Sequence, residues 1–519
     1  MKKHIRFRLH IPCAVLLCAC LYALPSCRSG HEPSKNKTSM YADEKGNFSP
    51  AKMWHAECST CHDLDKMGAA TAESLKNAIK NVHVMSAYSQ ILSDTDITAL
   101  AGFMRGGAAE SRAGGGFYAF ISAKTCGSCH DQNFNHWRHS MHALAHSEPL
   151  YDAYFIKASQ DSGKELEVFC ASCHTPIGVL DKEIPFPQPL KNIGDTRVSE
   201  IASDGVQCDF CHSISSSKPG KPGNASYVVT RSNVKYGPFK DAVSSFHETA
   251  YSELHTSAGF CGNCHDVDHP GNGIPLETTY KEWKSGPYAA EGVTCQDCHM
   301  SRGLTKFEAS PGKAALSGPD RSHVSLHYFA GPNLLFKNVK EAPELRALSE
   351  KLLRSAAEVK ITDLSPKGNS LKLTVAVTNK GAGHSIPTGV TEIRQAWLEI
   401  TAADASGKVF FHSGALDAQG NIAATPEPVL YYTWVKNAQG QFTTQFWNAV
   451  EKTRDHRIPP RATLKESVSM PARKGKITIT VKLQYRSVSP AGLEEVNAAG
   501  TLGDIPVFTM ANDEKSFSF

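Results

Sequence analysis

Residues 126–130 read Cys-Gly-Ser-Cys-His, and the same Cys-x-x-Cys-His pattern occurs five more times in this chain of 519 residues. In chain order, the six motifs comprise Cys58, Cys61 and His62; Cys126, Cys129 and His130; Cys170, Cys173 and His174; Cys208, Cys211 and His212; Cys261, Cys264 and His265; and Cys295, Cys298 and His299. We number them first to sixth. They contain 12 of the 16 cysteines, and the remaining four all precede residue 28.

Each motif has the residues that covalent haem attachment needs. Two thiols add across the vinyl groups of the haem, and the histidine that follows binds the iron from one face. Disulfide frameworks, zinc sites and thioredoxin-like redox pairs do not require histidine directly after every cysteine pair. Because histidine occupies only 23 of 519 positions, six such coincidences have a chance probability on the order of 10⁻⁸. The motifs therefore predict six covalently bound haem c groups.

The first 26 residues have the pattern of a signal peptide. Four cations precede an apolar stretch at about residues 11–24, which is too short to span a bilayer comfortably. Residues 24–27, Leu-Pro-Ser-Cys, resemble a bacterial lipobox in which Cys27 becomes the lipidated N-terminus, with plain cleavage as the alternative. Residues 27–47 are polar and poor in aliphatic side chains, so we expect a flexible tether.

The charge of the chain argues against a nucleic-acid partner. The formal net charge is +4, and the leader alone carries four cations. The mature chain is then close to neutral and haem propionates make it acidic, whereas nucleic-acid binding needs a basic surface. After the leader, no apolar run in the sequence reaches transmembrane length. Membrane attachment is therefore expected through the lipid on Cys27 or through a partner.

Residues 48–110 are predicted to form a small all-α domain around the first motif. Ser49-Pro50 has the pattern of a helix start, with proline at the first helical position. Residues 93–96, Ser-Asp-Thr-Asp, resemble a capping box. The apolar residues that follow share one helix face; they are Ile97, Leu100, Ala101 and Met104. Gly106-Gly107 then ends the helix.

This arrangement resembles a class I monohaem cytochrome c. The shared features are a helix that enters Cys58, a methionine about twenty residues after the motif, and a closing helix. The resemblance implies that Met85 is the second iron ligand beside His62. The family's usual proline after the methionine is absent, so His83 is the alternative ligand, and Met85 could instead fill the core.

Residues 111–340 hold the other five motifs, whose first cysteines are separated by 44, 38, 53 and 34 residues. Regular elements are hard to discern there, as expected where haems supply the apolar core. After the second motif comes Trp137-Arg-His-Ser-Met-His142, which resembles the cytochrome c-554 group of multihaem proteins. The resemblance covers about residues 115–335 and implies a mostly α-helical and irregular pentahaem domain. It also implies that His142 binds a neighbouring haem iron.

Each clustered haem has one axial position left after its own histidine is counted. From residue 126 onward, twelve further histidines are available, which exceeds the demand. We expect the second ligands to come from a pool in which at least one member does not bind: His142, His247, His255, His323, His327 and His384. His269 is a reserve candidate. His412 and His456 are predicted to be ordinary residues, and His136, His139 and His146 crowd the segment around His142.

Residues 356–519 are predicted to form a C-terminal all-β immunoglobulin-like sandwich. Apolar and polar residues alternate at 371–377 and at 477–483, which is typical of half-buried strands. Two shorter segments, 396–400 and 409–411, lie between Gly, Asn and Asp turns. In the loop at 381–389, three glycines and a proline surround His384, and we expect this histidine to reach a haem iron.

The surplus of histidines favours irons that are closed on both faces, which exchange electrons without binding a substrate. The predicted function is electron relay between periplasmic or cell-surface redox proteins. One alternative is a reductase or oxidase of a small nitrogen or sulfur compound with one open haem. Pentahaem nitrite reductases carry a Cys-x-x-Cys-Lys variant at the catalytic haem, and this chain lacks it. The other alternative is a subunit of an outer-membrane or extracellular electron conduit.

Overall fold

The computed structural model describes residues 53, 71–81, 88–89, 92–98, 100–101, 104 and 119–519, except 193, 221, 245, 304–307, 334–336 and 501. The chain divides into two compact units, Met1–Ile121 with Arg231–Asn233, and Ser122–Thr230 with Val234–Phe519. The predictions for the leader, Cys27, the tether, the first motif, His83 and Met85 lie outside the described residues.

In the first unit, a predicted helix start and a buried face are both present. The Ser93 amide donates to Asp96 Oδ2 at 2.9 Å and the Asp96 amide donates to Ser93 Oγ at 3.2 Å, which confirms the capping box. The four apolar residues that follow, Ile97, Leu100, Ala101 and Met104, are at most 6% exposed. They form one cluster with residues of α4 (Ala72–Asn81), as the helical period requires.

The second unit begins with helices that are mostly short. They are α6 (Ala123–Gly127), α7 (Asp131–Trp137), α8 (Pro149–Ser162), α9 (Lys164–His174), α10 (Pro176–Leu180), α11 (Glu200–Ser203), α12 (Cys208–Cys211), η7 (Glu253–Thr256), α13 (Ala258–Gly262), α14 (Thr279–Ser285), α15 (Pro287–Ala290), α16 (Cys295–His299), α17 (Lys337–Glu341) and α18 (Pro343–Ala356). No helix in the described part of the chain is long and apolar enough to cross a membrane. The short helices agree with the mostly α-helical and irregular region that the resemblance implied.

Short two-stranded ladders connect these helices. β1 (Ile214–Ser217) pairs with β2 (Tyr227–Val229), and β3 (Val234–Gly237) pairs in parallel with β4 (Glu248–Tyr251). β5 (Val267–Asp268) pairs with β6 (Pro275–Glu277), and β7 (Gly312–Lys313) pairs with β8 (Asp320–Arg321). Two of these ladders begin directly after a motif, β1 after the fourth and β5 after the fifth, so they fix the chain that follows it.

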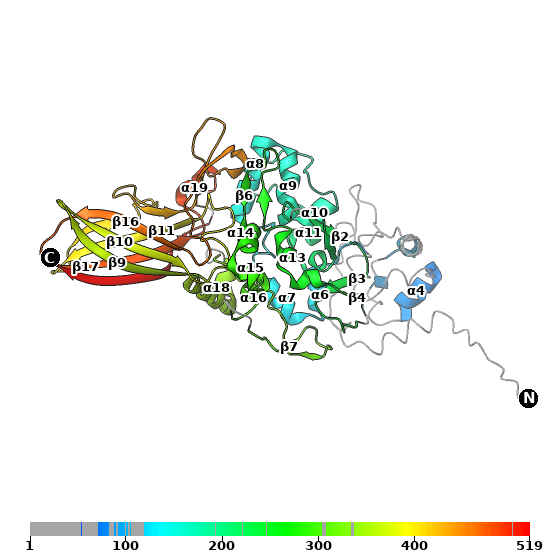
Figure 1. Cartoon of the computed structure of the whole chain (residues 1–519). Helices are drawn as coiled ribbons and strands as arrows, with labels where there is room; N and C mark the ends of the chain where they lie inside the picture. Colours follow the sequence, from blue (N-terminus) through cyan, green and yellow to red (C-terminus); the bar gives the residue numbers. More distant parts are fainter. Residues whose placement is uncertain are drawn as a thin grey trace, which may run out of the picture. The chain divides into compact units, whose positions relative to one another are not determined.

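Two larger sheets form the C-terminal region. One has the strand order β16 (Thr463–Pro471), β10 (Ser370–Asn379), β9 (Ala357–Lys367); the other has β12 (Val409–Ser413), β11 (Gln395–Asp404), β17 (Lys476–Arg486), β18 (Phe508–Ser518), with β13 (Val429–Tyr431) also on β11. All these pairs are antiparallel. β14 (Thr433–Lys436) pairs separately with β15 (Glu451–Asp455). Figure 1 shows the long strands grouped at one end of the second unit and the helices α6–α16 at the other.

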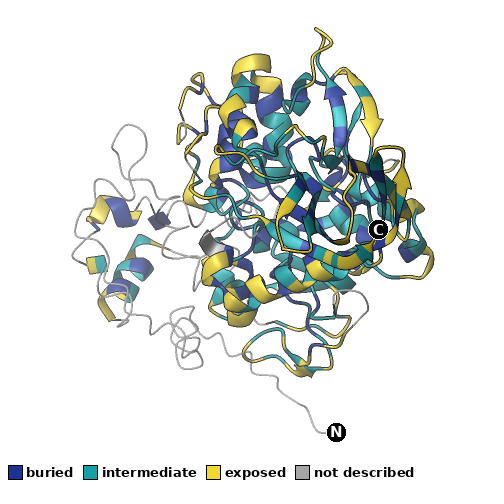
Figure 2. Ribbon diagram, turned by 90° about the vertical axis from the view of Figure 1, so that its left-hand side faces the viewer, coloured by how far each residue is buried: buried dark blue, intermediate teal, exposed yellow. Residues whose placement is uncertain are grey.

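The core between the two sheets follows the alternation in the sequence. Leu373 and Val375 of β10 and Leu398 and Val481 of the other sheet are each 0% exposed and belong to one cluster. Burial of such a side chain contributes about 1.5–3 kcal/mol. In Figure 2 the strands and helices carry buried residues on their inner sides and exposed residues on their outer turns. The predicted strands are confirmed.

The helical and β-rich regions of the second unit share apolar clusters. Leu150 and Tyr154 of α8 pack in one cluster with Trp447 of η8 (Phe446–Asn448) and with Leu493 of α19 (Pro490–Glu495). The Asn272 side chain also donates to the Ala449 carbonyl at 2.8 Å. The β-rich region is therefore packed directly against α8 and the loop that follows the fifth motif.

Candidate haem sites

The third, fourth and sixth motifs lie in α9, α12 and α16, and the second and fifth begin at the ends of α6 and α13. In the second and fifth motifs, the amides of His130 and His265 donate to the carbonyls of Cys126 and Cys261 at 2.9 Å, which closes one helical turn. Residues three apart lie on the same side of a helix, so the turn directs both thiols of a motif to one side. The ten cysteines of these motifs are free and of intermediate exposure. Burial raises the pKa of Cys170, Cys211 and Cys298 to about 12. These side chains are neutral thiols in position to add to haem vinyl groups.

The histidine of each described motif has one ring nitrogen held by the protein. In four motifs Nδ1 lies within hydrogen-bond distance of a backbone carbonyl: Ala314 at 2.7 Å for His130, Ala145 at 3.1 Å for His174, Tyr236 at 2.6 Å for His212 and Ala330 at 2.6 Å for His299. In the fifth motif, Nδ1 of His265 lies 3.2 Å from Oε1 of Glu277. Such a partner fixes the tautomer and leaves Nε2 for a metal, as in known haem and metal sites.

Four of these histidines face a second histidine across a nearly constant gap. The ring centroids are 6.4 Å apart for His130 and His247, 6.2 Å for His265 and His142, 6.4 Å for His212 and His327, and 6.3 Å for His299 and His384. Two imidazoles that bind one metal from opposite faces through bonds of about 2 Å have centroids roughly 6.3 Å apart. The gap therefore fits a haem iron between each pair.

The partner histidines are also held for ligation. Nδ1 lies 2.9 Å from the Glu248 carbonyl in His247, 3.0 Å from the Ser325 carbonyl in His327, and 2.9 Å from the Ser385 carbonyl in His384. Burial lowers the pKa of His142 and of His327 to about 3. Both rings are therefore neutral, the form that binds a metal.

The two other members of the histidine pool are placed differently. His255 lies 5.5 Å from His212, but its Nε2 is 3.2 Å from the Cys211 carbonyl. His323 accepts a hydrogen bond from the Ser310 amide at Nδ1, and its Nε2 lies 3.3 Å from Ser325 Oγ. The structure thus brings four members of the pool opposite a motif histidine and engages the other two with the backbone or with serine.

The third motif differs from the other four. Among the described residues, no histidine faces His174 at the spacing of the four pairs. Its ring is instead stacked on Tyr151, with centroids 4.0 Å apart and planes 8° apart. Tyr151 lies on α8, close to Cys170 and Cys173 of the third motif. The described part of the chain therefore supplies an aromatic neighbour to His174 but no second imidazole.

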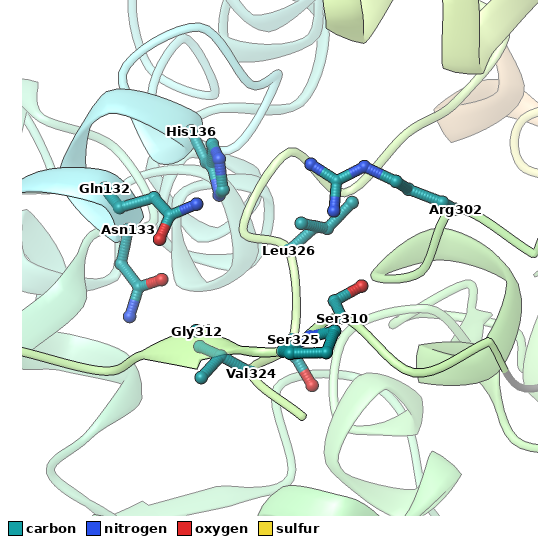
Figure 3. Close-up of a pocket in the computed structure, with 10 residues that line it drawn as sticks. Gln132, Asn133, His136, Arg302, Ser310, Gly312, Val324, Ser325 and Leu326 are labelled. Atoms are coloured by element: carbon teal, nitrogen blue, oxygen red, sulfur yellow. The ribbon is translucent and has the colours of Figure 1, made fainter. Parts of the chain in front are cut away.

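The remaining histidines have structural partners. Five of them lie within hydrogen-bond distance of another residue: His139 of Asn135, His146 of Thr175, His269 of Trp447, His412 of Glu399 and His456 of Glu466. His136 lines a pocket, and Figure 3 shows His136 and Asn133 facing Arg302 and Ser310 across it. Its ring packs against that of Tyr328 at a tilt of 36°, with the centroids 4.2 Å apart.

The loop that carries His384 is fixed to the helical region by Glu282 of α14. The Ser385 amide donates to Glu282 Oε2 at 2.8 Å, and Arg457 Nη1 donates to Glu282 Oε1 at 2.6 Å. Thr279 and Thr388 are joined through their hydroxyls at 2.8 Å. The side chains of Glu282 and Arg457 are 13% and 7% exposed. His384 therefore faces His299 because a buried ion pair holds its loop there.

Thiols of different motifs lie next to one another. Cys126 of the second motif lies next to Cys208 of the fourth, Cys173 of the third lies next to Cys264 of the fifth, and Cys261 of the fifth lies next to Cys295 of the sixth. Cys264 of the fifth motif also lies near Cys211 of the fourth, which joins the two groups. The five described motifs therefore form one continuous cluster, in which the fifth motif lies beside the third, fourth and sixth.

Comparison with known proteins is consistent with this geometry. Residues 125–213, which include the second to fourth motifs, match the family model described as cytochrome c554 and c-prime. The chain is a multihaem c-type cytochrome. The fold of this cytochrome is similar to that of a penta-haem cytochrome c552 from Thermochromatium tepidum, with a TM-score of 0.53 and 19% identity over 76% of this chain and 99% of that one.

A curated relative supports the same class. The cytochrome is 31% identical over 93 residues to the cytochrome c nitrite reductase subunit NrfA of Nitratidesulfovibrio vulgaris. The match covers 17% of this chain and 14% of that protein. The likeness is therefore local.

Two residues at the haem sites were not identified from the sequence. Nothing in the sequence marks Tyr151 as a neighbour of His174, because an aromatic residue within a helix usually belongs to the core. Glu277 lies twelve residues after His265 and is brought back to it by the β5–β6 ladder. A short hairpin after a Cys-x-x-Cys-His motif, ending in a carboxylate, is the signal that could have identified it.

Proposed function

We propose that this cytochrome carries six haems and relays electrons between other redox proteins. Bound haem supplies the one-electron chemistry. The observation that carries the proposal is the set of four histidine pairs with centroids 6.2–6.4 Å apart. Histidines on both faces of an iron leave no position for a substrate, which is the arrangement of an electron carrier.

The ligand assignments follow from these pairs. His247 is the second ligand at the second site, His327 at the fourth, His142 at the fifth and His384 at the sixth. At the first site, the resemblance to class I cytochromes c implies Met85 as the second ligand beside His62. His255 and His323 then lie near the ligands but bind no iron.

The domain assignments follow the distribution of motifs. Residues 48–110 form a class I cytochrome c domain, residues 111–340 a pentahaem domain of the cytochrome c-554 type, and residues 356–519 an immunoglobulin-like sandwich. The sandwich supplies His384 and so completes the sixth site. The leader directs export to the periplasm or outer membrane, where Cys27 anchors the chain by its lipid.

The haem content and the spin state of the irons test this function. Pyridine haemochrome analysis of the exported protein, set against its intact mass, is expected to give six haems per chain. Electron paramagnetic resonance is expected to show low-spin iron at the second, fourth, fifth and sixth sites. Five or fewer haems would contradict the count, and high-spin iron at most sites would contradict the relay.

The third site favours a second candidate function. His174 has a tyrosine as its ring neighbour and, among the described residues, no facing histidine. An iron open on one face there would allow reduction or oxidation of a small nitrogen or sulfur compound, a role suggested by the local match to a nitrite reductase subunit. One high-spin signal per chain that shifts when nitrite or sulfite is added supports this candidate, and an all-low-spin protein excludes it.

A further inference from the structure

The hydrogen-bond partner of the motif histidine differs at one of the five described sites. His130, His174, His212 and His299 each face a neutral backbone carbonyl through Nδ1. His265 faces the carboxylate of Glu277 at 3.2 Å. The difference is one of charge, because all five contacts involve the same ring nitrogen.

The local fold holds Glu277 at His265. β5 begins two residues after His265 and pairs with β6, whose last residue is Glu277, in register with Val267. The Thr279 hydroxyl donates to the same Oε1 at 3.2 Å, and the Glu277 side chain is 14% exposed. The β5–β6 ladder and the Thr279 hydroxyl therefore fix the Glu277 carboxylate at Nδ1 of His265.

A carboxylate behind a ligating histidine changes the iron through the ring. The hydrogen bond draws the Nδ1 proton toward the carboxylate and makes the imidazole a stronger donor at Nε2. A stronger, more negative ligand stabilises ferric over ferrous iron and lowers the reduction potential. Of the two side chains, that of Glu277 is the more shielded from water, at 14% exposed, and a charge acts more strongly on its neighbour where water is excluded.

The fifth site is also the junction of the cluster. Its Cys264 lies next to Cys173 of the third motif, and its Cys261 lies next to Cys295 of the sixth. Cys264 also lies near Cys211 of the fourth motif, which links the fifth site toward the second. The shortest route for an electron from the third or sixth site to the fourth therefore passes through the fifth site.

We propose that Glu277 makes the fifth site the lowest in potential of the five clustered sites. This inference rests on the proposed electron relay. A low-potential junction stays oxidised while its neighbours are reduced, so it passes electrons between branches without storing them. Glu277 is a positioning and tuning residue that acts through His265 and does not touch the iron.

Glu277→Gln tests the proposal in the full-length protein with all haems attached. The glutamine carbonyl still accepts from His265 and Thr279, so the charge is removed with the hydrogen bonds retained. In a redox titration followed by electron paramagnetic resonance, we expect one midpoint, the lowest of the cluster in the wild type, to shift upward. The haem content and the number of low-spin irons stay unchanged. Glu277→Asp, which keeps the charge, is expected to restore a low midpoint.

Asp268→Asn is the matched control. Asp268 lies on β5 opposite Pro275 of the same ladder and pairs with Lys281, not with a motif histidine. Equal shifts in Glu277→Gln and Asp268→Asn, or no shift in either, overturn the proposal. If Glu277→Gln loses haem, the wild type still decides: its lowest-potential low-spin signal must have imidazolate character, and an ordinary imidazole signature there overturns the proposal. High-spin iron in the wild-type fifth site would instead refute the relay itself.

Discussion

Removing Glu282 should loosen the loop that carries His384. Glu282→Ala deletes the acceptor of the Ser385 amide at 2.8 Å and of Arg457 Nη1 at 2.6 Å. Breaking a buried ion pair costs about 3–5 kcal/mol. Asp455 still binds Arg457 through Nε and Nη2 at 2.8 and 2.7 Å. We therefore expect the free energy of unfolding to fall by about 3 kcal/mol, the lower end of this range.

The assay has a stability readout and a ligand readout. Denaturant unfolding followed by far-ultraviolet circular dichroism gives the change in free energy, and the visible spectrum reports the sixth site, because Ser385 is next to His384. The control is Glu291→Ala, which removes the exposed pair with Arg461 in the same contact region and should cost about 0–1 kcal/mol. A loss below about 1 kcal/mol for Glu282→Ala, with unchanged spectrum, would refute the role given to this ion pair.

Three further outcomes are expected. His384→Ala should leave the haem content intact and convert one iron to the high-spin state, which magnetic circular dichroism detects; an unchanged spectrum would show that His384 is not a ligand. Glu392 lies near Lys452, Arg457 and Asp455, and burial raises its pKa to about 7. A carboxyl whose folded pKa is raised binds its proton more tightly when folded, so stability falls as pH rises from about 4.5 to 7. Glu392→Gln should remove up to about 3 kcal/mol of that dependence in unfolding curves at pH 5 and 8. Gly205 has φ +67° and a Cβ there would lie 2.7 Å from the His142 carbonyl. Gly205→Ala should therefore cost about 1–3 kcal/mol and alter the spectrum of the fifth site, and a neutral result would contradict this close approach.

The elements that the sequence predicted best are those with local causes. The capping box at Ser93 depends on residues three apart, and the buried strand around Val375 depends on simple alternation, so both could be inferred without tertiary information. The attachment motifs are equally local, because both thiols and the histidine fall within five residues.

The pairing of histidines could not be inferred in the same way. His327 and His323 are four residues apart and chemically identical, yet one faces His212 and the other is bound by Ser310. The choice depends on backbone contacts such as the Leu326 amide to the Met300 carbonyl at 2.8 Å, which join distant segments. Backbone partners have no sequence signature, because every residue has a carbonyl.

The closeness of thiols from different motifs bears on how the protein is made. Cys126 and Cys208 lie side by side although 82 positions separate them, and Cys173 and Cys264 do so across 91 positions. In an oxidising compartment, neighbouring thiols form disulfides. A chain that completed its fold before haem attachment would join cysteines of two different motifs and block both. Maturation must therefore attach each haem while the chain is still open, or keep the thiols reduced until attachment is complete.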